Sequence, residues 1–203
     1  MCNHTKQVSG FTLLQLMAAI AIAGILMAAA VPTFRDMLRR TRLTTYANEF
    51  VTALNIARSE AIKQGITVTV RKIGGTGTYW NTSGWNVFVD TNANGILDTS
   101  EKILRTYNAL PNVYTLTGST TGSFDTFIRY QSDGTRYLPS GSTNNDSFTI
   151  CDNSDNNNTI EPYTAKVIII SLTGRIQMAR DRDGNGIPEN NSTTPVTYTS
   201  CGL

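Results

Sequence analysis

The chain has 203 residues, with 17 basic and 15 acidic side chains and a formal net charge of +2. This near balance argues against a general nucleic-acid coat, although it leaves room for a local basic patch. The length is sufficient for one domain with a real core, and only one segment is long and apolar, at the extreme N-terminus.

The apolar segment covers residues 11–31 and contains no charged side chain. As an α-helix rising ~1.5 Å per residue it would measure about 31 Å, enough to cross the hydrocarbon core of a bilayer. One interpretation is an ordinary secretory signal, which would be cut near Ala28–Ala30 and would release a soluble protein. The preceding residues favour another interpretation, because a small residue, Gly10, is followed at once by the bulky run that begins at Phe11.

The stretch around Gly10 resembles the N-terminus of type IV prepilins. The family pattern is a Gly, then Phe-Thr-Leu-Ile/Leu-Glu-Leu, an apolar run and a later Pro, and the matching residues here are Gly10, Phe11–Leu16 and Pro32. The resemblance implies that a prepilin peptidase cleaves between Gly10 and Phe11, that the new amine of Phe11 is methylated, and that the helix is retained. Residues 1–10 would then be a leader peptide, and Phe11, Gln15 and Pro32 would bear on filament assembly.

Gln15 departs from the family pattern, which usually has Glu at this place. In the family that carboxylate is held to neutralise the N-terminal amine of a neighbouring subunit, and a buried charge is costly unless it is paired. A carboxamide accepts a hydrogen bond but cannot cancel a charge. Two interpretations stay open: a subunit at a filament tip, where one neighbour is missing, or a tolerated near-isostere.

Residues 33–64 predict an amphipathic helix, since Pro32 would kink the helix rather than end it. Apolar residues recur at three- and four-residue steps, and Gly65 supplies a stop. The predicted apolar stripe comprises Ala47, Phe50, Val51, Leu54, Ala57 and Ala61. We therefore assign residues 11–31 to a transmembrane or filament-core helix and residues 32–65 to an amphipathic helix laid on a sheet.

The remaining residues, 66–203, are rich in Thr, Ser, Asn and Gly with short β-branched runs between, which is typical of a β-rich domain with long polar loops. Gly and Asn clusters separate the predicted strands. These are residues 66–71, 86–90, 102–105, 113–116, 126–130, 147–151, 166–172 and 175–178. A long helix followed by such strands predicts an α+β fold, in which the helix stripe covers one face of a sheet.

Several pieces of the chain resemble, in the same order, the GspH/FimT group of minor pilins and pseudopilins. They are Ala57-Arg58-Ser59-Glu60-Ala61-Ile62, Trp85–Asp90, Ile103-Leu104-Arg105, Phe148–Cys151, Val167–Ser171 and Thr173-Gly174-Arg175. Single pieces are weak, and residues 144–162 and the tail after Met178 match weakly, but the ordered set behind a prepilin-like start is specific.

The resemblance implies a minor type IV pilin or a type II secretion minor pseudopilin, a structural subunit that primes, caps or decorates an envelope filament. Its implied partners are other pilins or pseudopilins, the prepilin peptidase and the inner-membrane assembly platform. The implied location is the bacterial inner membrane, crossed once, with the globular domain in the periplasm, and afterwards a pilus or pseudopilus.

Three cysteines occur, at Cys2, Cys151 and Cys201. If the leader is removed, Cys151 and Cys201 remain, and in an oxidising compartment they would join. Such a disulfide would tie the C-terminus to the β-rich domain. The alternative is a pair of free, buried thiols.

The sequence contains no evident catalytic set. The only histidine, His4, lies in the expected leader, so the mature chain would have no His-based triad. There is no nucleotide-binding loop, nucleophile elbow or close Cys/His cluster for zinc. The sequence therefore favours a structural subunit with no small-molecule substrate over the alternative of a signal-anchored periplasmic enzyme.

The loop that starts at Asp90 matches the twelve-residue calcium-loop pattern of alternating oxygen ligands, a turning Gly and a closing Glu. The ligands would be Asp90, Asn92, Asn94, the carbonyl of Ile96, Asp98 and Glu101. The flanks are predicted strands rather than helices, so a plain hairpin loop turning at Asn94-Gly95 stays open. A second stretch, residues 181–186, is similar but ends in Glu189 at a different spacing, with a polar loop as its alternative.

The candidate nucleic-acid contacts are Arg175, Arg180 and Arg182. Some members of the GspH/FimT group take part in DNA uptake, and the resemblance points to a C-terminal Gly-Arg-x-Arg motif that binds phosphates. This chain has Gln177 in place of the second Arg, and Asp181 and Asp183 alternate with the other two arginines. The alternative function is thus a DNA-binding minor pilin of a competence pilus, and the competing interpretation is a solvated turn.

Overall fold

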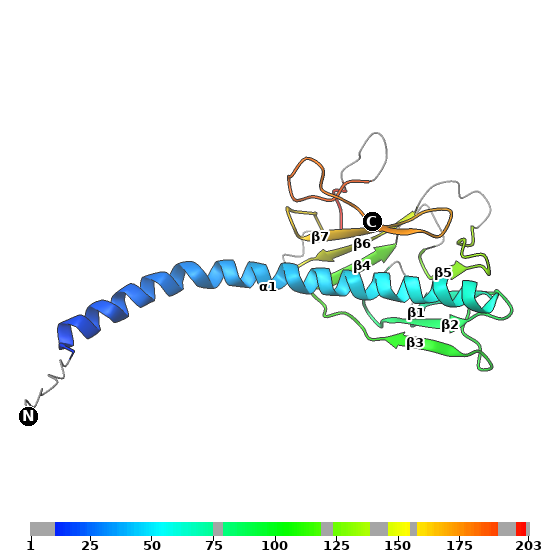
Figure 1. Ribbon diagram of the computed structural model, residues 1–203, viewed down its shortest axis with the longest axis horizontal. Helices are drawn as coiled ribbons and strands as arrows, with labels where there is room; N and C mark the ends of the chain where they lie inside the picture. Colours follow the sequence, from blue (N-terminus) through cyan, green and yellow to red (C-terminus); the bar gives the residue numbers. More distant parts are fainter. Residues whose placement is uncertain are drawn as a thin grey trace, which may run out of the picture. The chain divides into compact units, whose positions relative to one another are not determined.

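The computed structural model describes residues 11–74, 79–118, 124–138, 146–154, 158–190 and 198–201. The chain divides into two compact units, Met1–Arg39 and Arg40–Leu203. One long helix, α1 (Leu13–Gln64), has residues in both units and continues through Pro32 (Figure 1). The predictions for Gly10 and the leader lie outside the described residues.

The first unit is a solvent-exposed apolar helix. Every described side chain from Phe11 to Arg39 is exposed. Among the described residues, α1 is the one helix long and apolar enough to cross a membrane, and none of its qualifying stretch is buried within the protein. An apolar helix that is bare on all sides needs lipid or another apolar surface around it, so this part of α1 fits a membrane anchor.

The second unit contains short strands that agree with the predicted ones to within two residues at either end. They are β1 (Val68–Lys72), β2 (Trp85–Val89), β3 (Ile103–Tyr107), β4 (Tyr114–Gly118), β5 (Phe127–Tyr130), β6 (Asp146–Asp152), β7 (Ala165–Ile170) and β8 (Ile176–Met178). They form two antiparallel sheets, sheet A in the order β3-β2-β1-β5 and sheet B in the order β4-β6-β7-β8. The α+β prediction is confirmed.

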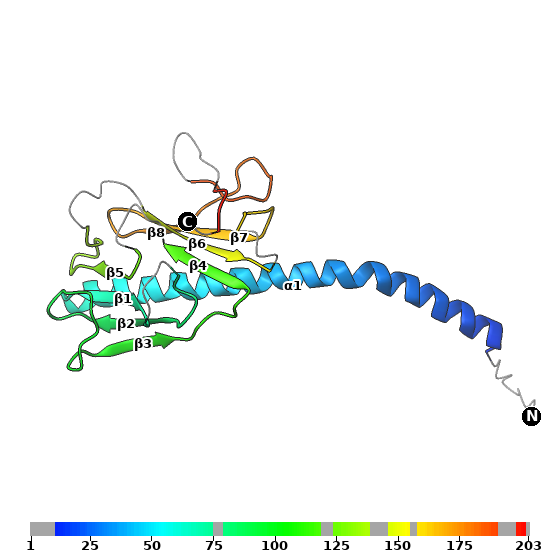
Figure 2. The ribbon, with the colours of Figure 1, turned by 180° about the vertical axis from the view of Figure 1, so that it is seen from behind.

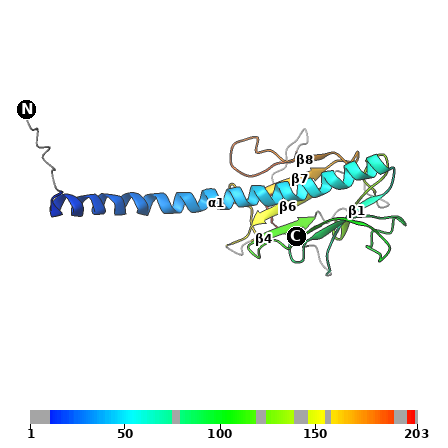
Figure 3. The ribbon, with the colours of Figure 1, turned by 60° about the horizontal axis from the view of Figure 1, so that its bottom comes forward.

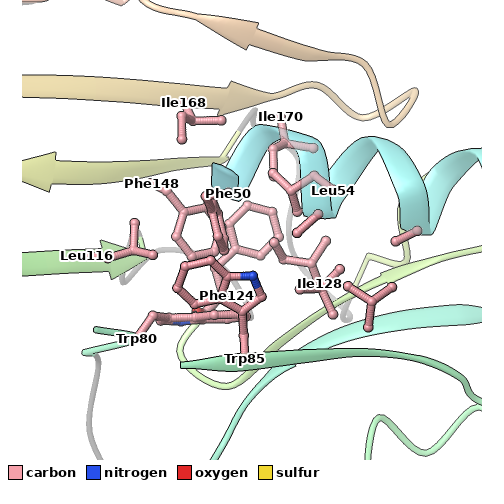
Figure 4. Close-up of a cluster of buried hydrophobic side chains, with 14 of the residues drawn as sticks. Phe50, Leu54, Trp80, Trp85, Leu116, Phe124, Ile128, Phe148, Ile168 and Ile170 are labelled. Atoms are coloured by element: carbon pink, nitrogen blue, oxygen red, sulfur yellow. The ribbon is translucent and has the colours of Figure 1, made fainter. Parts of the chain in front are cut away.

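The buried face of α1 packs against both sheets, rather than against the one sheet face predicted from its stripe. Phe50 shows this most directly, with its ring centroid 5.1 Å from that of Trp85 in sheet A and 4.7 Å from that of Phe148 in sheet B (Figure 4). The second half of α1 runs beside strands of both sheets in Figure 2 and crosses β6 and β7 in Figure 3. The predicted stripe is buried except Val51, which is half-buried.

A buried ion pair joins the two sheets. Arg136, whose backbone pairs with Tyr130 of β5 in sheet A, contacts Asp146 of β6 in sheet B at 2.5 Å between Nη1 and Oδ2. The two side chains are 1% and 2% exposed. The Arg136 guanidinium also lies 5.2 Å from the ring centroid of Phe124. Both charges are therefore desolvated, and each depends on the other.

The predicted disulfide is present between Cys151 of β6 and Cys201, whose Cα atoms are 5.7 Å apart. Both cysteines belong to a small buried cluster with Ile160 and Ala165. The Cys201 backbone N–H donates to the carbonyl of Asn158 at 2.9 Å. The segment around Cys201 is thus fastened to β6 by a covalent bond and to the connection between β6 and β7 by backbone pairing.

Candidate functional site

The helix α1 starts with a reciprocal capping box between Thr12 and Gln15. The Thr12 backbone N–H donates to Gln15 Oε1 at 3.0 Å, and the Gln15 backbone N–H donates to Thr12 Oγ1 at 3.3 Å. Such a pair satisfies two of the backbone donors that a helix start leaves open. Gln15 therefore makes the hydrogen bond that a Glu would make here, but without the negative charge.

The three predicted nucleic-acid contacts lie around one pocket at the edge of sheet B. The pocket has a volume of about 630 Å³ and is lined by Arg175, Gln177, Met178, Ala179, Arg180 and Arg182. We call it the arginine pocket. The lining residues lie on and beside β8, an edge strand of sheet B, which Figure 2 labels. Gln177, which stands where the Gly-Arg-x-Arg motif of the family has its second arginine, also lines the pocket.

The two acidic residues beside Arg182, Asp181 and Asp183, do not line the arginine pocket and accept hydrogen bonds within their own loop. Asp181 accepts the backbone N–H groups of Gly184 and Gly186 at 2.8 and 2.7 Å. Asp183 accepts the backbone and side-chain N–H groups of Asn185 at 3.1 and 2.8 Å. None of the six described lining residues is acidic. The arginine pocket thus carries three cations with no lining carboxylate, a suitable surface for a polyanion.

A tight turn between β7 and β8 presents Arg175 to the arginine pocket. The Ser171 N–H donates to the Arg175 carbonyl at 2.9 Å, and the Arg175 N–H donates to Ser171 Oγ at 3.1 Å. Gly174 takes a φ of 75° in this turn, a conformation that favours glycine. The Thr-Gly-Arg piece of the sequence is therefore a turn whose backbone fixes where the Arg175 side chain begins.

The Asp90 loop is an internally hydrogen-bonded connection between β2 and β3. Fully buried Asp90 accepts the Thr69 hydroxyl at 2.7 Å and the backbone N–H groups of Asn94 and Gly95 at 3.0 and 2.9 Å. Asp98 accepts the side-chain amides of Asn92 and Asn94 at 2.8 and 3.2 Å, and Glu101 accepts the backbone N–H of Asp98 at 3.1 Å. In the described part of the chain, no three His, Cys, Asp or Glu side chains are grouped as a metal site requires.

We expect calcium and its chelator to leave the melting temperature of the full chain unchanged. The carboxylates of Asp90, Asp98 and Glu101 already accept hydrogen bonds from protein donors, so the loop is fastened by the protein itself. A ligand that binds only the folded state would raise the melting temperature as its concentration increases. A rise with calcium but not with magnesium, reversed by EDTA, would contradict this expectation and show that the folded chain binds calcium.

The family of the chain is shown by a family model that matches more than half of it. The family model "Type II transport protein GspH" matches residues 46–174. Two curated Pseudomonas aeruginosa proteins, both called fimbrial protein, are 45% identical over 60 residues, which is 30% of this chain. The match covers 38% of the length of those relatives.

A solved structure shares the fold. The type IV minor pilin FimU of Pseudomonas aeruginosa superposes with a TM-score of 0.51 and 22% identity, covering 70% of this chain and 90% of FimU. At this identity the likeness concerns the fold, whereas the family model spans most of the described second unit. The prediction of a GspH/FimT-group protein is confirmed, and the family and fold are those of structural pilins. The chain therefore belongs to the family of the type II transport protein GspH.

Proposed function

We propose that the chain is a minor type IV pilin or a type II secretion minor pseudopilin, a structural subunit that primes, caps or decorates an envelope filament. One observation carries this proposal. The helix α1 begins with an exposed stretch that is uncharged up to residue 31, and it continues into a unit that matches the GspH family. The helix holds the subunit in the inner membrane before assembly, with the second unit in the periplasm. The proposed role is structural, and no catalytic step is assigned to the chain.

The apolar helix supplies the surface by which the subunit joins other pilins. Small residues recur along it, and the space where a side chain would stand at Gly24 is open. Such positions let helix backbones approach closely in an apolar setting. Beside Pro32, the exposed side chains of Leu26, Ala30 and Phe34 add to this apolar surface. Transfer from lipid to a bundle of pilin helices keeps these side chains out of water at both stages.

Blocking the leader cleavage tests this proposal. Gly10→Val should leave the leader in place, because a bulky residue at the cut would not suit a peptidase that recognises a small one, and the uncut protein should stay in the membrane. Mass spectrometry should show the full-length chain, and filaments sheared from the cells should lack it. Ser9→Ala is the matched control and should be processed. Incorporation of uncut Gly10→Val into filaments would refute the assembly mechanism.

A second candidate function, DNA binding within a competence pilus, is supported by the arginine pocket. Phosphate contacts release counterions, so affinity falls as salt rises, with a slope set by the number of contacts. Arg175→Gln should weaken binding of a labelled oligothymidine and reduce the salt slope by about one contact. The matched control is Arg105→Gln, at an exposed position on β3 of sheet A. Equal affinity and equal salt slope in the two variants would contradict DNA binding at the arginine pocket.

A further inference from the structure

Arg58 of α1 joins two turns that belong to different sheets. Its Nε donates to the carbonyl of Gly134 at 3.0 Å, and its Nη2 donates to the carbonyl of Thr173 at 3.2 Å. Gly134 lies in the turn after β5 of sheet A, and Thr173 lies in the turn between β7 and β8 of sheet B. The guanidinium presents several N–H donors in a fixed planar arrangement, so a single side chain can hold both carbonyls.

The two turns that Arg58 holds are packed against one another with little room. A Cβ atom at Gly174 would stand 2.2 Å from the Gly134 carbonyl oxygen, and one at Gly134 would stand 2.5 Å from Ile62 Cδ1 of α1. Burial raises the pKa of the adjacent Tyr130 well above its ordinary value, and the positive charge of Arg58 acts in the opposite direction. The backbone around Thr173 and Gly174 therefore has a defined place relative to α1.

This turn leads directly to the arginine pocket. The residue after Gly174 is Arg175, whose N–H and carbonyl are both bonded to Ser171 within the turn. Thr173, in the same turn, accepts from Arg58. The helix piece Ala-Arg-Ser-Glu and the turn piece Thr-Gly-Arg are far apart in the sequence, yet they meet here through one hydrogen bond.

We propose that Arg58 is a positioning residue for the arginine pocket: it holds the Thr173–Gly174 turn against α1, so that Arg175 faces a bound polyanion beside Arg180 and Arg182. Arg58 does not line the arginine pocket itself. The proposal rests on the second proposed function, the binding of a phosphate backbone. In this proposal the lining arginines contact the anion, whereas Arg58 only fixes the position of Arg175.

The test uses the full chain in detergent and a labelled oligothymidine, with affinity measured over a series of salt concentrations. Arg58→Gln should weaken binding about tenfold at a fixed salt concentration, as expected for the loss of a charge-assisted hydrogen bond that orders the site. Its salt slope should stay that of the unmodified chain, because no phosphate contact is removed, whereas Arg175→Gln should lower the slope. Arg58→Lys should bind with intermediate affinity. The matched control is Arg42→Gln, at an exposed position on the same helix.

A second readout needs no ligand. Amide hydrogen exchange in residues 171–175 should be faster in Arg58→Gln than in the unmodified chain and in Arg42→Gln, because the turn loses its attachment to α1. If the unmodified chain binds no oligothymidine, DNA binding fails, and faster exchange would still support a positioning role for Arg58. Unchanged exchange in Arg58→Gln, unchanged affinity, or a slope lowered as far as in Arg175→Gln would each overturn the proposal.

Discussion

Replacing Asp146 by Ala should lower the free energy of unfolding by about 3–5 kcal/mol, because it leaves the Arg136 guanidinium buried without its counter-charge. The pair is 2.5 Å apart, and neither side chain is more than 2% exposed. An isolated charge in an apolar interior loses its hydration and gains nothing in return. Urea unfolding of the full chain in detergent, followed by tryptophan fluorescence, measures the loss, since Trp80 and Trp85 are fully buried.

Two further variants separate the charge effect from packing. Removing both charges by Arg136→Met with Asp146→Leu should recover most of the loss, because apolar groups of similar volume then fill the space. Glu60→Ala breaks the pair with Lys63 on the exposed surface of α1 and should cost less than about 1 kcal/mol. If Asp146→Ala lowered the free energy of unfolding no more than Glu60→Ala, the Arg136–Asp146 pair would not stabilise the packing of the two sheets.

Removing the disulfide, by Cys151→Ala with Cys201→Ala, should lower the free energy of unfolding by about 4 kcal/mol, the value that chain-entropy bookkeeping gives for a loop of this length. The two cysteines are 50 residues apart, so the cross-link restricts a long stretch of the unfolded chain. Unfolding with and without reductant measures the effect. Reductant should destabilise the unmodified chain by a similar amount and leave the double variant unchanged. Equal stability of the two proteins without reductant would contradict the expectation.

Local patterns predicted the elements well, because each depends on residues that are close in the sequence. The spacing of Ala47, Phe50, Leu54, Ala57 and Ala61 marks the face of α1 that is buried. Gly65, with a φ of 67°, lies just past the end of the helix at Gln64, as a glycine stop should. Alternating apolar residues located the strands to within one or two residues, although not their exact bounds, which hydrogen bonds to neighbouring strands decide.

Long-range pairing was beyond the reach of such patterns. A helix stripe shows that one face is buried, but not that two sheets share it, as they do at Phe50. Trp80 and Phe124 lie outside the strands and still fill the central cluster (Figure 4). From the sequence alone, Arg136 would be expected at the surface, because nothing in its local pattern shows that Asp146 of β6 is its buried partner. Their burial follows from the tertiary arrangement and not from any local period.

The candidate site was found in part. The resemblance to the GspH/FimT group pointed to Arg175, and the nearby Arg180 and Arg182 do line the same pocket. The sequence could not show that Asp181 turns its carboxylate into its own loop, because that depends on the backbone conformation of Gly184 and Gly186. Nor could it show that Arg58 reaches the turn of Arg175, since Arg58 and Thr173 are 115 positions apart in the sequence.

The most direct test of the assembly account is the N-terminus of the mature protein. Protein purified from the cell envelope, and from sheared filaments, is analysed by N-terminal sequencing and mass spectrometry. We expect a chain that begins at Phe11, carries a methylated amine and keeps the whole apolar helix of α1. A mature chain that begins near Val31 or beyond, released freely into the periplasm, would contradict it.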